Sequence, residues 1–305
     1  MINLVSVSGG KDSTATLLVA IERDVENIQA VFCDTGNEHP ATYDYVRYLE
    51  AVTGVKIQWL KQDFTDWWWR RRDYVRDIWP EKGVPDSTVK RALVVLEGGP
   101  TGNPFLDLCV IKGRFPSRMA QFCTQCLKSE PATEYLLNLV DSHGAVESWQ
   151  GVRAEESIRR AKQPEWEDKG GGYTIRRPIH KWTVRQVFNQ HKRHGIDPNP
   201  LYKLGMSRVG CMPCINARKK EIQEISKRFP DQFERIAEWE FCVSVAAKRE
   251  AATFFASVGD TKTAFERGNI REVVKWSKTL RGGKIIDPNS EDDAPMCSSA
   301  YGLCE

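Results

Sequence analysis

The sequence contains no apolar run that approaches the roughly 20 residues of a membrane span, and no internal repeat or long low-complexity segment. Met1 leads directly into a short apolar stretch with no basic region before it, so we expect no signal peptide. These absences argue against a membrane protein, a repeat array and a secreted protein. We therefore expect a cytoplasmic protein with no membrane partner.

A large excess of one charge is also lacking. The 44 lysine and arginine residues nearly balance the 41 aspartate and glutamate residues, which leaves a formal net charge of +3. A charge this small does not require a nucleic-acid partner, although it is compatible with anionic substrates. The chain has 305 residues, of which 41% are hydrophobic, and this is enough for a substantial core without disulfides.

Nine cysteines in a reducing compartment indicate metal binding or catalysis rather than a disulfide framework. Four of them form two Cys-x-x-Cys pairs, Cys123 with Cys126 and Cys211 with Cys214. Four thiolates can hold a tetrahedral Zn²⁺ ion or a 4Fe–4S cluster, and the spacing does not choose between them. Unligated cysteines are the third alternative. The other five are isolated in the sequence: Cys33, Cys109, Cys242, Cys297 and Cys304. Cys33 stands at the end of the second predicted strand, so we expect it to be buried.

Apolar runs alternate with helical patterns in the first part of the chain. Residues 2–8, 28–32 and 55–60 are predicted strands, and helices are predicted over 12–23 and from Pro40. This order predicts an α/β fold with a doubly wound, mostly parallel sheet. Later segments continue the pattern, with strands predicted over 146–152 and 173–179 and helices over 128–140 and 183–193.

The pattern breaks between about residues 64 and 122, where Gly- and Pro-containing loops predict an insertion over one end of the sheet. We therefore predict a nucleotide-binding domain over residues 1–216 that contains this insertion. A helical region, broken near Pro230, is predicted over 217–284. The polar, cysteine-containing end, 285–305, is predicted to be a flexible tail.

The first predicted strand ends in Ser8-Gly9-Gly10-Lys11-Asp12-Ser13 and leads into a helix. Glycines let a backbone approach an oxyanion closely, and a helix N-terminus attracts phosphate or sulfate. Two serine hydroxyls and the charge of Lys11 add to this attraction. The loop is neither a Walker A motif nor the Gly-x-Gly-x-x-Gly dinucleotide loop. A chance glycine turn is the alternative, but the position between strand and helix favours an anion-binding loop.

This loop resembles the PP-loop of ATP pyrophosphatases and sulfonucleotide reductases. Further segments are similar, in the same order, to the adenylyl-sulfate/phosphoadenylyl-sulfate reductase family: Asp34-Thr35-Gly36, Cys123 to Pro131, Gly151 to Ser157, Pro178 to Thr183 and Asn199 to Cys214. The resemblance implies an adenine nucleotide alpha-hydrolase-like fold. It also implies an adenine-nucleotide site made by Ser8, Gly9, Gly10, Lys11, Asp12, Ser13, Asp34, Thr35, Gly36 and Arg153, with Mg²⁺ as a further candidate ion.

The resemblance favours a 4Fe–4S cluster on Cys123, Cys126, Cys211 and Cys214, with zinc as the alternative, because cluster-bearing adenylyl-sulfate reductases carry cysteine pairs in these two segments. In that family the first pair is adjacent, whereas here Thr124 follows Cys123. Lys128 is either a cation that attracts the cluster and an anion or a solvated lysine.

The reductases of this family carry a nucleophilic cysteine near the C-terminus, in Glu-Cys-Gly-Leu-His. Here the chain ends in Gly302-Leu303-Cys304-Glu305, so the cysteine follows Gly-Leu and the histidine is missing. The resemblance implies Cys304 or Cys297 as the catalytic thiol, together with Lys11. Incidental cysteines in a frayed tail are the alternative.

Three functions follow from these motifs. The first is a sulfonucleotide enzyme for sulfur transfer or reduction, which would act on adenylyl sulfate or phosphoadenylyl sulfate with a thiol electron donor such as thioredoxin. The second is an ATP pyrophosphatase that activates nucleic acid for sulfur insertion, as in DNA phosphorothioation or tRNA thiolation, with a sulfur donor protein. The third is an inactive nucleotide-binding regulator. The sequence does not indicate the oligomeric state.

Several other residues allow two interpretations. The run Trp67-Trp68-Trp69 followed by three arginines suits either nucleic-acid stacking or a helix that buries two of the tryptophans, and we expect the second. A further set of arginines, expected to be solvated or substrate-facing, comprises Arg159, Arg160, Arg176 and Arg177. The five histidines, among them His191, form no recognisable ligand pattern.

Overall fold

The computed structural model describes residues 1–255 and 268–279. Within them the chain divides into two compact units. We call the first the sheet unit; it comprises Met1–Lys61 and Thr124–Met212. We call the second the helical unit; its described part comprises Gln62–Cys123 and residues 213–279 without 256–267. Cys297, Cys304 and the rest of the predicted tail lie outside the described residues.

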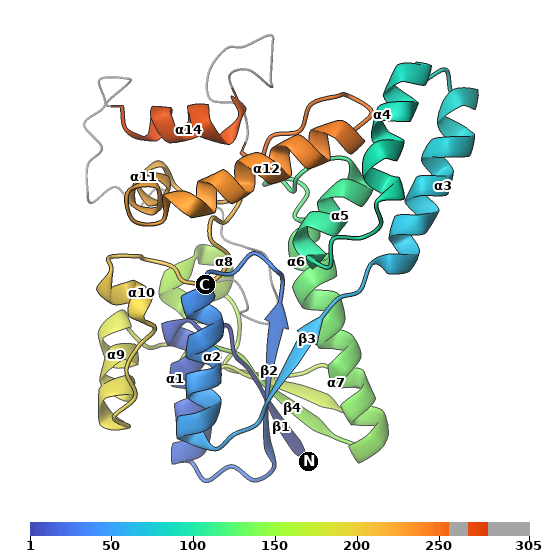
Figure 1. Cartoon of the computed structure of the whole chain (residues 1–305). Helices are drawn as coiled ribbons and strands as arrows, with labels where there is room; N and C mark the ends of the chain where they lie inside the picture. The colour runs from blue at the N-terminus through green and yellow to red at the C-terminus, as the bar shows by residue number, and fades with distance from the viewer. Residues whose placement is uncertain (256–267, 280–305) are drawn as a thin grey trace. The chain divides into compact units, whose positions relative to one another are not determined.

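The sheet unit contains a six-stranded sheet with the order β3-β2-β1-β4-β6-β5 (Figure 1). Its neighbouring strands are parallel except for β5, which runs antiparallel to β6. The predicted doubly wound, mostly parallel α/β sheet is therefore confirmed. The strands are β1 (Ile2–Ser6), β2 (Ile28–Asp34), β3 (Ile57–Lys61), β4 (Val146–Trp149), β5 (Trp166–Asp168) and β6 (Tyr173–Arg176).

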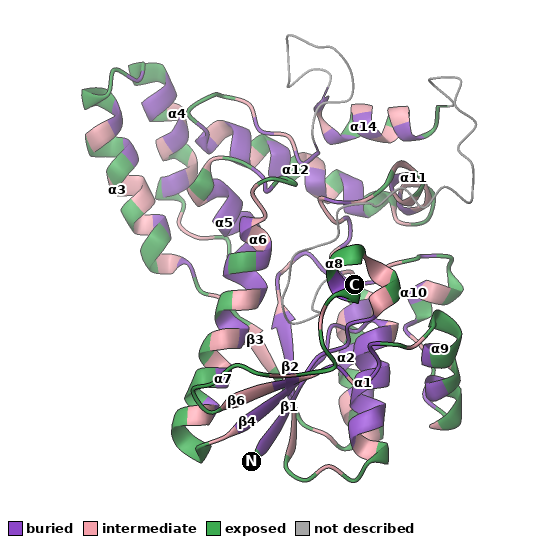
Figure 2. Ribbon diagram, turned by 180° about the vertical axis from the view of Figure 1, so that it is seen from behind, coloured by how far each residue is buried: buried purple, intermediate pink, exposed green. Residues whose placement is uncertain are grey.

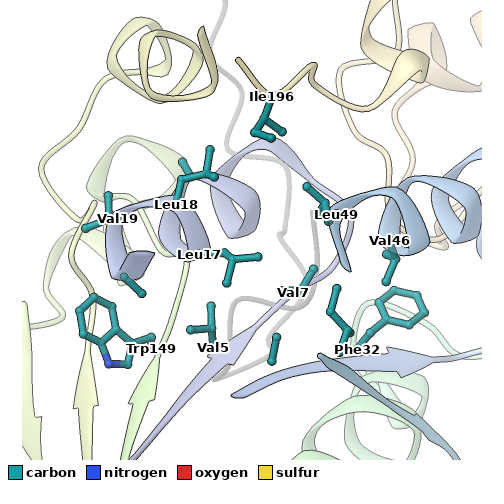
Figure 3. Close-up of a cluster of buried hydrophobic side chains, with 14 of the residues drawn as sticks. Val5, Val7, Leu17, Leu18, Val19, Phe32, Val46, Leu49, Trp149 and Ile196 are labelled. Carbon is teal, nitrogen blue, oxygen red and sulfur yellow. The ribbon is translucent and has the colours of Figure 1, made fainter. Parts of the chain in front are cut away.

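Side chains of β1 alternate between two apolar cores, as the two-residue period of a strand requires. Val5 and the following Val7 belong to the core that includes residues of α1 (Lys11–Glu22), α2 (Pro40–Thr53) and α9 (Val184–Arg193) (Figure 3). Ile2 and Leu4 belong to the opposite core, which includes residues of α7 (Glu130–His143). Because both faces are covered, all five residues of β1 are buried.

The order of the strands places a topological switch point beside β1. The chain moves from β1 to β2 on one side and later returns to β4 on the other. Open α/β sheets bind ligands at the carboxyl ends of strands at such a point. The loop after β1 leads there into α1, a helix whose residues from Asp12 to Ala20 are all buried (Figure 2).

Shorter elements complete the sheet unit. They are the π-helix Gln125–Ser129, the 3-10 helix Ala154–Glu156, α8 (Ile158–Ala161) and α10 (Pro200–Lys203). The three-residue helix α6 (Phe122–Thr124) contains the boundary between the units, since Cys123 belongs to the helical unit and Thr124 to the sheet unit. No described helix is long and apolar enough to cross a membrane.

The helical unit combines the predicted insertion with the C-terminal helices. The loops expected between residues 64 and 122 were largely wrong, because this stretch forms α3 (Thr65–Glu81), α4 (Asp86–Glu97) and α5 (Pro104–Lys112). Most of its glycines and prolines stand between these helices or at their ends and so mark helix boundaries. The other helices are α11 (Lys219–Arg228), α12 (Pro230–Ala246) and α14 (Ile270–Ser277), and Pro230 separates the first two as expected.

The tryptophan run lies on α3, but only Trp68 is fully buried, so the expectation of two buried tryptophans was wrong. The Trp68 indole donates a hydrogen bond to the backbone oxygen of Leu96 at 2.8 Å. Trp67 is 41% exposed, and Trp69 is half-buried beneath the guanidinium of Arg72. Three consecutive helical residues point about 100° apart, so a narrow core face accepts only one of them.

Candidate nucleotide-binding site

The loop after β1 requires glycine at two points of close approach. Gly9 has φ +78°, and a Cβ there would lie 2.8 Å from Cγ2 of Thr42 on α2. A Cβ on Gly151, after β4, would lie 2.8 Å from the backbone nitrogen of Ser13. Gly10 is the N-cap of α1, and no side chain caps it. Gly9 therefore lets the loop approach α2, and Gly151 lets the backbone after β4 approach the first turn of α1.

The hydroxyls of Ser8 and Ser13 brace the loop. Their oxygens are 3.0 Å apart, and the Ser13 hydroxyl also accepts from the Ser8 amide at 3.1 Å. Both side chains are buried. In this conformation the serines fix the shape of the loop, while the N-terminal dipole of α1 supplies the attraction for an anion.

Asp12 forms ion pairs with Lys11 and Arg153, the two cations that the sequence predicted for the site. Its fully buried carboxylate contacts Lys11 Nζ through Oδ2 and Arg153 Nε through Oδ1, each at 2.7 Å. Arg153 also donates to Glu155 at 2.7 Å. Burial opposes the charge of Arg153, but Asp12 and Glu156 outweigh it and raise the pKa of the guanidinium. We call Lys11, Asp12 and Arg153 the Asp12 triad.

Three residues without a role in the sequence-based site also hold this loop. The Lys11 backbone amide donates to the Tyr202 hydroxyl at 3.0 Å, and the Asn199 side-chain Nδ2 donates to the Gly9 backbone oxygen at 3.1 Å. His191 Nε2 lies 2.8 Å from the Lys11 oxygen, and burial lowers the pKa of this histidine. Asn199 and Tyr202 stand in a segment that carries the family resemblance, so a signal existed for them. His191 has no local motif.

The Asp34-Thr35-Gly36 turn follows β2 at the same edge of the sheet. Asp34 Oδ1 accepts hydrogen bonds from the Gly36 amide at 3.0 Å and the Tyr43 hydroxyl at 2.7 Å. Buried Glu38, which the sequence analysis did not single out, accepts from the Thr35 hydroxyl at 2.6 Å and the Thr35 amide at 3.1 Å. Burial, followed by Glu38 and Asp34, raises the pKa of Tyr43. Hydrogen bonds to the carboxylates of Asp34 and Glu38 thus fix the conformation of the turn.

The paired cysteines divide between the units. Cys126 and Cys211 belong to the sheet unit, and Cys123 and Cys214 belong to the helical unit. Cys211 Sγ lies 3.7 Å from a carboxylate oxygen of Glu38 and from the Thr35 hydroxyl. Among the described residues, no group of three or more His, Cys, Asp and Glu side chains is arranged to hold a metal ion.

Two expectations about individual residues had different outcomes. Lys128 is only 6% exposed, so its interpretation as a solvated lysine was wrong. Cys33, expected to be buried, is 3% exposed, and its thiol lies 3.6 Å from the Lys128 backbone oxygen. Burial raises the pKa of Cys33 to about 12, which keeps it a neutral thiol.

Three of the further arginines form ion pairs, which corrects the expectation that they are solvated or face a substrate. Arg176 pairs with Glu147 at 2.7 Å across neighbouring strands, and Arg160 pairs with Glu156. Buried Arg177 pairs with Glu167 at 3.2 Å. Arg159 is exposed. Three of the four arginines are therefore paired with carboxylates that lie 4, 10 and 29 residues away in the sequence.

The chain belongs to the phosphoadenosine phosphosulfate reductase domain family, whose model matches residues 2–81 and 111–217. The matched stretches cover more than half of the chain. They include the loop after β1, the Asp34–Gly36 turn, Arg153 and all four paired cysteines.

Individual relatives vary in how much of the chain they match. An uncharacterized 37.8 kDa protein in gpa 5′region of Escherichia phage 186 is 44% identical over 327 residues, which cover all of this chain and 97% of that protein. The adenosine 5′-phosphosulfate reductase of Allochromatium vinosum is 32% identical over 105 residues, or 33% of this chain and 37% of the reductase. The crystal structure of phosphoadenylyl-sulfate (PAPS) reductase from Candida auris, a phosphate complex, aligns with a TM-score of 0.43 and 17% identity, and covers 70% of this chain and 83% of that one.

Proposed function

We propose that the protein is a sulfonucleotide enzyme that binds adenylyl sulfate or phosphoadenylyl sulfate at the loop after β1. The observation that carries this proposal is the Asp12 triad at the N-terminus of α1. The triad sets two cations at the N-terminus of α1, and both the cations and the positive end of the helix dipole favour a bound phosphate or sulfate group. Membership in the phosphoadenosine phosphosulfate reductase domain family supports an adenine nucleotide as the carrier of that group.

Within this proposal, each element of the sheet unit has a distinct task. Lys11 contacts the anion as a point charge, and Asp12 positions Lys11 and Arg153 rather than contacting an anion itself, because it is fully buried and negative. The Asp34–Gly36 turn contacts the remainder of the nucleotide, since β2 is parallel to β1 and ends at the same edge of the sheet.

Reduction requires a nucleophile in addition to the binding site. A cysteine thiolate attacks the sulfur of the sulfonucleotide, an S–S bond forms as the S–O bond breaks, and the nucleotide leaves with the electron pair of that bond. A dithiol donor such as thioredoxin then releases sulfite and becomes a disulfide. We propose Cys304 or Cys297 for this thiol on the family resemblance; both lie outside the described residues.

The metal centre is a separate proposal that rests on residue type and spacing. Cys123, Cys126, Cys211 and Cys214 are suitable ligands for a 4Fe–4S cluster or Zn²⁺. The four cysteines divide between the two units, and a Cys211 thiolate would lie close to the Glu38 carboxylate. We therefore assign no reaction step to a metal. Iron and acid-labile sulfide in near-equal amounts would support the cluster, whereas one zinc per chain without sulfide would contradict it.

A second candidate is an ATP pyrophosphatase that activates nucleic acid for sulfur insertion. Its support is the departure of the first cysteine pair from the family pattern: Thr124 and Gln125 separate Cys123 from Cys126, and a π-helix begins at Gln125. In this alternative the same loop would hold the phosphates of ATP, and the product would be pyrophosphate rather than sulfite.

One experiment tests the proposed function. Protein purified without oxygen is offered ATP, adenylyl sulfate and phosphoadenylyl sulfate separately, with a thiol donor, and sulfite and pyrophosphate are measured. We expect sulfite from a sulfonucleotide. Lys11→Ala should weaken nucleotide binding, whereas Lys56→Ala, an exposed lysine just before β3 at the amino end of the sheet, should not. Pyrophosphate release from ATP without sulfite would favour the second candidate, and unchanged nucleotide affinity in Lys11→Ala would refute the loop assignment.

A further inference from the structure

The backbone amide of Lys11, the first residue of α1, donates to a side chain from a distant part of the chain. Its acceptor is the hydroxyl oxygen of Tyr202, at 3.0 Å, although Tyr202 lies 191 residues away in the sequence. The amide of Gly10, one residue earlier, donates within the loop to Ser8 Oγ at 3.4 Å. The first amides of a helix have no acceptor inside the helix, and they are the donors that bind anions. Tyr202 therefore accepts from a donor of the kind that phosphate and sulfate oxygens use.

The ring of Tyr202 also lies near the charged end of the Lys11 side chain. Lys11 Nζ is 5.8 Å from the ring centroid and 2.7 Å from the Asp12 carboxylate. A cation at this distance from an aromatic ring is attracted to it. Tyr202 is thus associated with Lys11 twice, through the amide and through the ammonium group. An oxyanion that bridges these two groups needs the place that the hydroxyl occupies.

The segment that carries Tyr202 is anchored on both sides of this residue, and all the anchors belong to the sheet unit. Before it, fully buried Asn199 donates through Nδ2 to the Gly9 backbone oxygen at 3.1 Å. After it, the Val209 backbone oxygen accepts from the Thr42 hydroxyl at 2.7 Å. Tyr202 itself is only half-buried. Rotation of one side chain can therefore take the hydroxyl away from the amide while the anchored backbone stays in place.

The charge of the acceptor decides which group the amide prefers. Hydrogen bonds to an ionised acceptor are roughly twice as strong as those between neutral groups. The positive end of the α1 dipole and the Lys11 ammonium group both add to the attraction for an anion, whereas a neutral phenol gains little from them. An anion should therefore displace the hydroxyl. Without an anion, the hydroxyl satisfies an amide that would otherwise lose its hydrogen bond.

We propose that Tyr202 is a placeholder for the anionic group of the nucleotide. Its hydroxyl accepts from the Lys11 amide in the free protein, and a phosphate or sulfate oxygen replaces it when the nucleotide binds. This inference rests on the proposed function, because it concerns the same loop. It makes Tyr202 a positioning residue, which keeps the first turn of α1 ready for the ligand and lowers the affinity by the hydrogen bond that must be given up.

Tyr202→Phe tests the exchange. The substitution removes the hydroxyl and keeps the ring, with its edge contact to Phe188 at a centroid distance of 5.9 Å. The free protein then loses a hydrogen bond that the complex does not contain. We expect adenylyl sulfate to bind about five-fold more tightly in calorimetry, the factor that corresponds to one neutral hydrogen bond. The free variant should also unfold at a lower temperature than the wild type, and saturating adenylyl sulfate should remove this difference.

Tyr135→Phe is the matched control. Tyr135 is also half-buried in the sheet unit, and its hydroxyl donates to the side chain of Gln29 at 3.3 Å, near the start of β2 and so at the opposite edge of the sheet. Its affinity for adenylyl sulfate should equal that of the wild type. A second measurement follows the hydroxyl directly. With 3-fluorotyrosine in place of all eight tyrosines, the fluorine resonance that is absent from Tyr202→Phe should shift as adenylyl sulfate is added.

Three results would overturn the proposal while Lys11→Ala still weakens binding. They are an unchanged affinity in folded Tyr202→Phe, a lower affinity, which would make the hydroxyl a direct contact of the ligand, and a Tyr202 resonance that does not shift. Failure of the proposed function appears differently, as unchanged affinity in Lys11→Ala or as a wild type that binds neither adenylyl sulfate nor ATP, and it removes both proposals. If the wild type binds only ATP, ATP becomes the probe, because it presents phosphate oxygens to the same amide.

Discussion

Two buried carboxylates, one in each unit, are stabilised in different ways. Asp12 in the sheet unit is fully buried and contacts two cations at 2.7 Å. Glu240 in the helical unit is 2% exposed and accepts hydrogen bonds from the backbone amides of Phe254 and Ile270, at 2.7 and 2.8 Å. Full charges thus compensate the first carboxylate, whereas peptide dipoles hold the second.

Because the two carboxylates are stabilised differently, the two units differ in how they respond to pH. Burial raises the pKa of Glu240 to about 7, although the two amides and Arg271 act against this shift. Glu240 can therefore lose its charge near neutral pH and still connect α12 with the segments around Phe254 and Ile270. Asp12, in contrast, must stay charged to hold Lys11 and Arg153 in place. The ligand edge of the sheet depends on fixed charge, and the helical unit contains a carboxylate that can be neutralised.

The largest expected effect comes from removing the charge of Asp12. Asp12→Asn leaves Arg153, whose side chain is only 5% exposed, without its main counter-charge. Breaking a buried ion pair from one side costs about 3–5 kcal/mol. We expect a loss of this order in the free energy of unfolding, measured in urea, together with weaker nucleotide binding. Asp44→Asn, which breaks an exposed pair with Arg47, is the control and should change little. Equal losses in both variants would contradict the distinction between the two pairs.

The next effect is a dependence of stability on pH that arises from Glu240. Its folded-state pKa of about 7 lies above the ordinary value of 4.5. The folded state therefore binds the extra proton between these values, and the contribution to stability is complete below pH 4.5 and is lost as pH rises through 7. The shift corresponds to a contribution on the order of 3 kcal/mol. Glu240→Gln should flatten this slope in denaturation curves recorded from pH 5 to 8. A slope that persists in Glu240→Gln would assign it to other groups.

The sequence predicted most of the sheet unit because its signals are local. Continuous apolar runs such as residues 2–8 predicted buried strands. The antiparallel strand β5 was missed, since three residues of mixed polarity carry no periodic signal. Glu38 and His191 were missed because their partners come from neighbouring turns and from a segment 180 residues away.

The helical unit was less predictable because it is assembled from segments that are distant in the sequence. α12 packs against α4 and α5, so residues 62–123 and 213–279 share one core. Taken alone, the frequent glycines and prolines of residues 64–122 predict loops.

A smaller effect separates two glycines of the sheet unit that share a positive φ. Gly9 has φ +78°, with Thr42 Cγ2 only 2.8 Å from an added Cβ, whereas Gly54 has φ +69° and open space around it. Gly9→Ala should therefore cost about 1–3 kcal/mol of strain and reshape the loop. Gly54→Ala should lose about 1 kcal/mol and leave nucleotide affinity intact. Thermal unfolding and nucleotide titration of both variants measure this difference. Equal nucleotide affinities would show that the close approach of Gly9 to Thr42 is not needed for nucleotide binding.

The smallest expected effect makes the two units respond to acid in opposite directions. Burial lowers the pKa of His191 below its ordinary value of 6.5. The contribution of His191 to stability is therefore present above pH 6.5 and is lost as pH falls toward its lowered folded-state pKa, which is the reverse of Glu240. On acidification from pH 7 to 5, protection from hydrogen exchange relative to the intrinsic rate at each pH should fall in α1, whose Lys11 oxygen His191 contacts, and should rise in α12. His191→Gln, which keeps a donor and cannot gain the charge, should remove the acid response of α1 alone. If α1 and α12 respond in the same direction in the wild type, His191 and Glu240 do not control the stability of their units separately.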